Sequence, residues 1–192
     1  MCEFGARGFS AGSLNVIASE AGIAKGSLFQ YFDDKLDVFV TICEHVSSRV
    51  EGAVLEVVDP DAALFDNLRR LVARWMAYFR ENALERQIAH ASHHELDVDV
   101  RRAVRAVPNA YHEQAFGPLV QAARERGELR PDVDERMVVS MITVVLRHLN
   151  SAPFDPAGDV GIRWHELDDD EVDRWALAYV DVLERAFGAP TP

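Results

Sequence analysis

Apolar side chains recur along this chain with the spacing of an α-helix. In the segment SLNVIASEAG, Leu14, Ile17, Ala18 and Ala21 fall at positions i, i+3, i+4 and i+7, which places them on one helical face. No stretch alternates apolar and polar residues between turn signals, as a half-buried strand would. The pattern therefore predicts an all-α fold without a sheet.

The same spacing, together with turn and capping residues, sets the expected bounds of the helices. We expect helices over residues 14–21, 25–32, 34–58, 61–81, 84–95, 98–126, 134–150 and 170–187. Gly22 and Gly127 are expected to end the first and the sixth of them, Gly22 in the left-handed conformation that glycine tolerates. Pro108 and Pro118 lie inside the sixth helix and should kink or split it, because each removes a backbone hydrogen bond.

Acidic residues stand where two of these helices begin. Asp33 or Asp34 can cap the third helix, and the run DDDE over residues 168–171 precedes the last one. Carboxylates at these positions interact favourably with the positive, N-terminal end of the helix dipole. The DDDE run therefore predicts an N-terminal cap, and a metal site is the alternative.

Composition narrows the class of protein. The chain has 192 residues, 48% of them hydrophobic, so a sizeable core is expected. A net charge of −12 argues against binding to nucleic acid or to an anionic membrane over the whole surface. The two cysteines have no metal-binding spacing, and no apolar run is long enough to span a bilayer. We expect a cytoplasmic protein that has no membrane partner.

The last two predicted helices are apolar around almost their whole circumference. Such a helix must be buried on more than one side, and a chain of this size has little to cover two of them. We therefore expect a homodimer that forms through these helices, with a central position in a monomer as the alternative. The apolar residues are Met137, Val138, Met141, Ile142, Val144, Val145, Leu146 and Leu149, then Val172, Trp175, Ala176, Leu177, Tyr179, Val180, Val182, Leu183 and Phe187.

Two short helices joined through Gly22 are typical of a helix-turn-helix, which can place its second helix in the major groove of DNA. Gln30 can hydrogen-bond base edges, with adenine as its best partner. Lys35 and the free N–H groups at the start of the next helix can hold a phosphate, as can Ser13 at the start of the first. The residues predicted to bind DNA are Ser13, Lys25, Ser27, Gln30, Tyr31 and Lys35.

The segment GFSAGSLNVIASEAGIAKGSLFQYFDDKLDVF, residues 8–39, resembles the DNA-binding signature of the TetR family of bacterial repressors. The matching positions are Gly8, Phe9, Ser13, Ile17, Ala18, Ala21, Gly22, Ile23, Gly26, Ser27, Leu28, Tyr31, Phe32 and Lys35. The resemblance implies a helix-turn-helix domain at residues 1–45 and a helical domain for effector binding and dimerisation at residues 46–192. It also implies a homodimer on a pseudo-palindromic operator, released when a small molecule binds.

Three positions depart from the family pattern. Ala24 replaces a capping Ser or Thr, and Phe29 replaces a tyrosine that contacts phosphate. The family's first helix normally begins well upstream of Gly8, so we expect the first residues to lie inside that helix. Residues 1–50 also carry four basic side chains against six acidic ones. These departures favour an alternative, namely a helical dimer that has lost DNA binding and acts through ligand or protein contacts.

Two further groups of residues are candidates for function. Trp75, Phe79, Tyr111, Phe116 and Met141 are expected to line an effector cavity, although such residues are more often simply core. A second group, His90, His93 and His94, has helical spacing that can hold a metal in a helical enzyme, with a polar helix face as the alternative. The chain has no nucleophile elbow, phosphate-binding loop or dinucleotide fingerprint, so we expect no enzyme, metal or cofactor.

Overall fold

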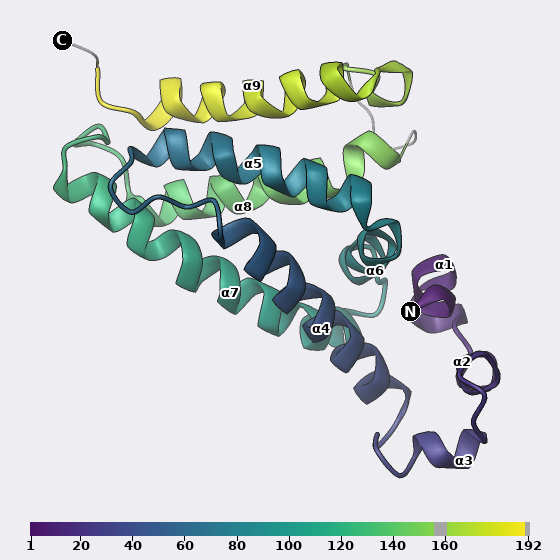
Figure 1. The fold of residues 1–192 in the computed structure, drawn as a ribbon. Coiled ribbons are helices and arrows are strands. Elements are labelled where there is room, and N and C mark those ends of the chain that lie inside the picture. Colours follow the sequence, from purple (N-terminus) through teal and green to yellow (C-terminus); the bar gives the residue numbers. More distant parts are fainter. Residues whose placement is uncertain (156–160, 191–192) are drawn as a thin grey trace. The chain divides into compact units, whose positions relative to one another are not determined.

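The structure, a computed structural model, describes residues 1–155 and 161–190. Within them the chain is helical (Figure 1), and the β pairing is a single isolated bridge between Leu129 and Gly188. The predicted all-α fold is confirmed. The elements are α1 (Cys2–Ala11), α2 (Leu14–Glu20), α3 (Lys25–Leu28), α4 (Lys35–Leu55), α5 (Leu64–Glu81), α6 (Ala83–His93), α7 (Val98–Glu125), α8 (Glu135–Ser151), η1 (Ala152–Phe154), η2 (Trp164–Glu166) and α9 (Asp169–Phe187).

Local sequence signals account for several helix ends. Gly22 and Gly127 adopt φ values of 68° and 73°, as expected of glycines that end α2 and α7. At the start of α9, Asp168 accepts from the backbone N–H of Glu171, whose side chain accepts from that of Asp168, which completes a capping box. Within the acidic run, Asp168 and Glu171 therefore form the predicted N-terminal cap of α9.

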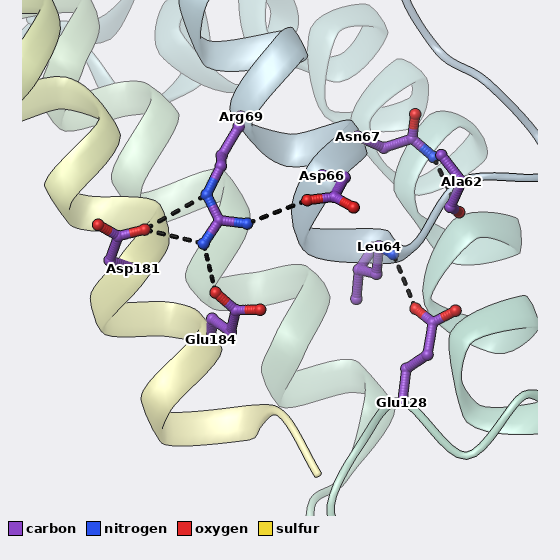
Figure 2. A network of polar contacts seen from close by, with 8 residues as sticks. All are labelled: Ala62, Leu64, Asp66, Asn67, Arg69, Glu128, Asp181 and Glu184. Carbon is purple, nitrogen blue, oxygen red and sulfur yellow. Dashed lines mark hydrogen bonds and ion pairs between the residues drawn. The ribbon is translucent and has the colours of Figure 1, made fainter. Parts of the chain in front are cut away.

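The start of α5 differs from its prediction because a side chain organises the preceding turn. The helix begins at Leu64 and not at residue 61. Asn67 accepts from the backbone N–H of Asp59 at 2.9 Å and donates to the carbonyl oxygen of Asp59 at 2.7 Å. Glu128, far away in sequence, accepts from the N–H of Leu64 at 2.7 Å (Figure 2). These contacts satisfy the turn, so the helix starts one turn late.

One other helix is shorter than predicted, and for α7 one of the two predicted outcomes is absent. The second short helix ends at Leu28 instead of residue 32, because the next N–H groups form turn bonds, as from Tyr31 to the carbonyl of Leu28. The long helix α7 continues through Pro108 and Pro118, from Val98 to Glu125, so the predicted split does not occur, and a kink stays a prediction. Buried residues on both sides of Pro108, such as Val104 and Phe116, anchor the helix in spite of the lost hydrogen bonds.

The helices fall into two compact units. The N-terminal unit consists of residues 1–50 and 81–109, and the C-terminal unit of residues 51–80 and 110–192. This grouping concerns packing. The functional division into residues 1–45 and 46–192 concerns what each part binds, and it stays a prediction.

Packed phenylalanine rings form part of the core of the N-terminal unit. Phe4 is fully buried, and its ring centroid lies 4.9 Å from that of Phe39 and 6.4 Å from that of Phe9. A Cβ atom on Gly12 would lie 2.5 Å from the Phe4 ring, so only glycine fits at this close approach. Buried Glu3 accepts from the backbone N–H of Ser13 at 3.0 Å, which ties α1 to the start of α2.

In the C-terminal unit, α9 runs antiparallel to α5. Arg69, in the first half of α5, contacts Glu184 and donates to Asp181 at 2.9 Å, and the latter hydrogen bond raises its pKa above the usual range (Figure 2). Arg80, near the end of α5, donates to Asp173 at 2.7 Å. The two arginines thus hold α9 at two points, about two turns apart, along the length of α5.

Helix α9 is also antiparallel to α8. His148, near the end of α8, lies 3.0 Å from the hydroxyl of Tyr179 through its Nε2 atom. At the other end, the β bridge joins the residues before α8 to those after α9. There the backbone N–H of Arg130 donates to the carbonyl oxygen of Phe187 at 2.9 Å. Because α5 and α8 are both antiparallel to α9, they run parallel to each other.

No helix of the described ranges, 1–155 and 161–190, is long and apolar enough to cross a bilayer.

The two thiols should differ in reactivity. Burial raises the pKa of Cys43 to about 12, a shift that Arg105 opposes and Glu44 reinforces, whereas Cys2 is exposed. We expect one thiol to react quickly with Ellman's reagent and the second only on unfolding. Because Cys43 keeps its proton when folded and loses it when unfolded, stability should fall as pH rises from about 9 to 12. Cys43→Ala should weaken this fall, and rapid reaction of both thiols in the folded protein would contradict the assignment.

Candidate nucleic-acid interface and effector region

The predicted helix-turn-helix is present as α2, a short turn and α3. Leu14, Ala18 and Leu28 are its buried positions. The turn is held by the backbone N–H of Ile23, which donates to the carbonyl of Ala18 at 3.0 Å. This bond reaches one residue farther back than an α-helical bond does. The left-handed conformation of Gly22 makes it possible.

The residues that follow the turn project toward solvent. Lys25 and Gln30 are exposed, Ser27 is half-buried, and Tyr31 is 79% exposed. Phe29, at the end of α3, is 49% exposed although it is apolar. Four of the six predicted DNA-binding residues therefore share one short surface segment around α3.

Lys35 and Ser13 are placed differently from the other four. The Nζ atom of Lys35 donates to the carbonyl of Ser10 at 3.2 Å and lies 4.7 Å from the centre of the Phe9 ring. Lys35 therefore fastens α4 to α1 as well as carrying charge at the surface. Ser13 occupies the N-cap position of α2, but its side chain makes no capping hydrogen bond.

The helix ends near this surface are poor in anion-binding groups. Ala24 stands at the N-cap position of α3 and offers no capping side chain. At the start of α4, the N–H of Asp37 donates to the carboxylate of Asp34 at 2.9 Å, and the Asp37 carboxylate accepts from the N–H of Asp33 at 3.0 Å. These carboxylates therefore accept hydrogen bonds from N–H groups that the sequence analysis had predicted to bind phosphate.

In the C-terminal unit, α5 and α7 bring three of the predicted effector residues into one aromatic cluster. The ring of Trp75 lies 5.2 Å from that of Phe79 and 6.3 Å from that of His112, and His112 lies 5.8 Å from Phe116. Helical spacing had not singled out His112, although it precedes Phe116 by one turn. We call these four residues the aromatic cluster.

The other two predicted effector residues lie elsewhere. Tyr111 is partly exposed and makes no ring contact among the described aromatic residues. Met141 follows Met137 by one turn and precedes Val144 by three residues, so it lies on the outward face of α8 that these exposed residues form. Their assignment to an effector site stays a prediction.

A small apolar gap lies beside the aromatic cluster. Its volume is about 10 Å³, which is no larger than a single water molecule needs. Four helices contribute to its lining, and all lining side chains are apolar. They are Leu68, Leu71, Val72, Phe116, Ile142, Val145, Leu146, Val180 and Leu183.

The three histidines at the C-terminal end of α6 do not converge on one point. The rings of His90 and His94 lie 4.2 Å apart, centroid to centroid. The Nδ1 atom of His93 lies 2.8 Å from the carbonyl oxygen of Ala89. Among the residues that the structure describes, no three His, Cys, Asp or Glu side chains are arranged to hold a metal.

Comparison with known proteins relates both parts of the chain to bacterial regulators. A family model described as "Bacterial regulatory proteins, tetR family" matches residues 2–42. Another, described as "Tetracyclin repressor-like, C-terminal domain", matches residues 59–159. The first model spans the whole helix-turn-helix, and the second extends from before α5 to beyond α8.

Several solved structures are similar over nearly the whole chain. A TetR family transcriptional regulator from Chloroflexus aurantiacus is 25% identical, with a TM-score of 0.66 over 98% of this chain and 89% of that one. The regulator FadR from Bacillus subtilis, solved with stearoyl-CoA, is 13% identical, with a TM-score of 0.77 over 94% and 91%. The ketosteroid transcriptional regulator KstR2 of Mycobacterium tuberculosis is 16% identical, with a TM-score of 0.64 over 98% and 91%. The last two show a shared fold.

Proposed function

The chain belongs to the TetR family of bacterial transcriptional regulators, and from this premise we propose that it is a ligand-responsive repressor. It binds a pseudo-palindromic operator as a homodimer, and a small-molecule effector releases it from DNA. The observation that carries the proposal is the helix-turn-helix, from which Lys25, Gln30 and Tyr31 project into solvent. In a two-fold dimer, such segments would lie about 34–36 Å apart and enter successive major grooves.

Outward apolar faces on α8 and α9 support the homodimer. On α8, Met137 and Val144 are spaced by seven residues and remain exposed in the single chain, and on α9 the same holds for Trp175 and Val182. A seven-residue spacing puts each pair on one helical face. Four large apolar residues at two neighbouring helices are what a second copy of the chain would cover.

The effector is proposed to bind in the C-terminal unit beside the aromatic cluster. FadR from Bacillus subtilis was solved with stearoyl-CoA, and KstR2 is a ketosteroid regulator. Both names denote molecules with large apolar parts. An effector with an apolar body would suit the aromatic and aliphatic side chains that α5, α7 and α8 direct at one another here.

Gln30→Ala tests the DNA-binding assignment. We expect selection from random duplexes with the wild-type chain to yield a pseudo-palindromic site. On that site Gln30→Ala should bind about 10- to 100-fold more weakly. It should also lose its preference for adenine at one base pair per half-site, because the two hydrogen bonds from the Gln30 amide to adenine are removed. Gln114→Ala, at an exposed position of α7, is the matched control and should bind as the wild type does.

Lys25→Ala should act differently on the same duplex. A lost phosphate contact weakens binding to all sequences alike and reduces the slope of log affinity against log salt by about one per subunit. Unchanged preference in Gln30→Ala would show that another residue determines specificity.

An alternative function is favoured by Ala24, by the tethered Lys35 and by the carboxylates at the start of α4. In it the protein is a helical dimer that no longer binds DNA and acts through ligand or protein contacts. Selection that enriches no duplex, from a chain that is folded and dimeric, would favour this alternative over the repressor.

A further inference from the structure

The C-terminal unit buries two asparagines, and they differ in one respect. Asn67 is 1% exposed and hydrogen-bonds the turn before α5 through both its oxygen and its nitrogen. Asn150, on α8, is 2% exposed, yet neither its Oδ1 nor its Nδ2 atom has a hydrogen-bond partner. The Nε1 atom of Trp75 is likewise buried and without a partner.

A buried amide without partners destabilises a folded protein, because it gives up its hydrogen bonds to water and receives none in return. Asn67 stabilises a turn and so has a structural role. Asn150 has no such role, and a leucine at its position would suit the neighbouring Leu146 and Leu149 better. Its polar atoms therefore suit a molecule from outside the chain.

Asn150 and Trp75 lie at the same level of the helical unit. Helix α9 passes both α5 and α8 in the opposite direction. Trp75 is midway between the two arginines of α5 that contact α9. Asn150 is two residues beyond His148, which contacts Tyr179, and Tyr179 lies between the two acidic residues that these arginines contact.

Neither residue lines the small apolar gap, but each lies one helical turn beyond a residue that does. Val72 and Leu146 line the gap, and they precede Trp75 and Asn150 by three and four residues, so each pair shares a helical face. Phe116 lines the gap from α7 and belongs to the aromatic cluster with Trp75. The region is therefore apolar at the gap, and its hydrogen-bonding atoms lie one helical turn farther along α5 and α8.

The charge of the region limits its ligand. In the described part of the C-terminal unit, the buried polar or charged residues are the two asparagines, Asn67 and Asn150. Arg69 and Arg80 of α5 are engaged by carboxylates of α9. His112, beside Trp75, and His148, two residues before Asn150, offer a counter-charge only to an anion and only when protonated. Burial of a charged head group without such a partner would be unfavourable. An indole N–H donates, whereas an amide both donates and accepts.

We propose that Asn150 and Trp75 form the hydrogen-bonding end of the effector site, and that the effector is an uncharged molecule with an apolar body and one end that both donates and accepts hydrogen bonds, as an alcohol or a primary amide does. The inference rests on the proposed effector function of this unit. Because the apolar gap holds no more than a water molecule, the ligand must displace side chains of α5, α7 or α8. Binding therefore selects a different arrangement of these helices, as an effector must.

The test uses decan-1-ol and decanamide as probes, with decane and sodium decanoate for comparison, on the full chain without DNA. Binding is followed by titration calorimetry and by tryptophan fluorescence. We expect the alcohol and the amide to bind and decanoate at pH 7 to bind at least tenfold more weakly. Asn150→Leu and Trp75→Phe should each weaken binding of the alcohol about tenfold, the effect of one lost hydrogen bond.

Thermal unfolding supplies a second readout that a structural role would reverse. Without a probe, Asn150→Leu should raise Tm by about 2–4 °C, because it removes an unpaired buried amide. Asn67→Leu is the matched control and should lower Tm, since it leaves the turn before α5 unsatisfied. A lowered Tm for Asn150→Leu would show that water or the protein itself satisfies the amide, and would overturn the proposal.

Equal binding of the probes to wild type and Asn150→Leu, or tighter binding of decanoate than of decanol, would also overturn it. Operator binding is measured separately on the same proteins. If probes bind through Asn150 while no duplex is bound, the site stands and the repressor function fails. If DNA is bound and no probe is, the repressor function stands and this inference fails.

Discussion

Phe4→Ala is expected to destabilise the N-terminal unit by about 3–5 kcal/mol, the cost of removing a fully buried phenylalanine. The side chain joins α1 to α4 through its contact with Phe39, and its ring fills the space against Gly12. The loss is a large share of the roughly 5–15 kcal/mol that stabilises a typical protein. We therefore expect the helix-turn-helix to unfold at lower urea than the C-terminal unit does.

Urea unfolding and hydrogen exchange are the measurements. Phe29→Ala is the control, since it removes the same side chain from a position that is 49% exposed, and it should change stability by less than about 0.5 kcal/mol. Operator binding at moderate urea should be lost first in Phe4→Ala. Similar unfolding curves for the two variants would mean that α1 contributes little to the unit.

The double variant Trp175→Glu, Val182→Glu is expected to convert a dimer into a monomer. Both residues lie on the outward face of α9 and are 42% and 55% exposed in the single chain. At the centre of a two-fold interface each carboxylate would be buried without a partner and would face its own copy, which is strongly unfavourable. We expect the dimer dissociation constant to rise by more than 100-fold, and operator affinity to fall with it.

Sedimentation or light scattering measures this change over a range of protein concentrations. Leu96→Glu is the control, because Leu96 is 90% exposed and lies between α6 and α7, away from α8 and α9 in sequence. It should remain dimeric. A double variant that stays dimeric would move the interface to another surface, and a wild-type chain that is monomeric at all concentrations would contradict the homodimer.

Short-range signals in the sequence predicted much of the fold. The left-handed Gly22, the capping box at Asp168 and the apolar spacing of the long helices each depend on residues within one or two turns. The family signature at residues 8–39 likewise depends on local order, and its identification is confirmed by the matched family models. Propensity and capping act between neighbours, which is why they can be recognised without a structure.

Contacts between distant residues decided the rest. The hydrogen bond to Glu128 helps to set the start of α5 at Leu64. Ser10 and Phe9 hold the side chain of Lys35, which the sequence analysis predicted to bind DNA. Two asparagines that look alike in sequence differ because one meets a turn and the other meets no partner. The sequence by itself determined the helical class, most helix bounds and the family. Which polar groups are satisfied depends on partners brought together by folding, so only the tertiary structure decided it.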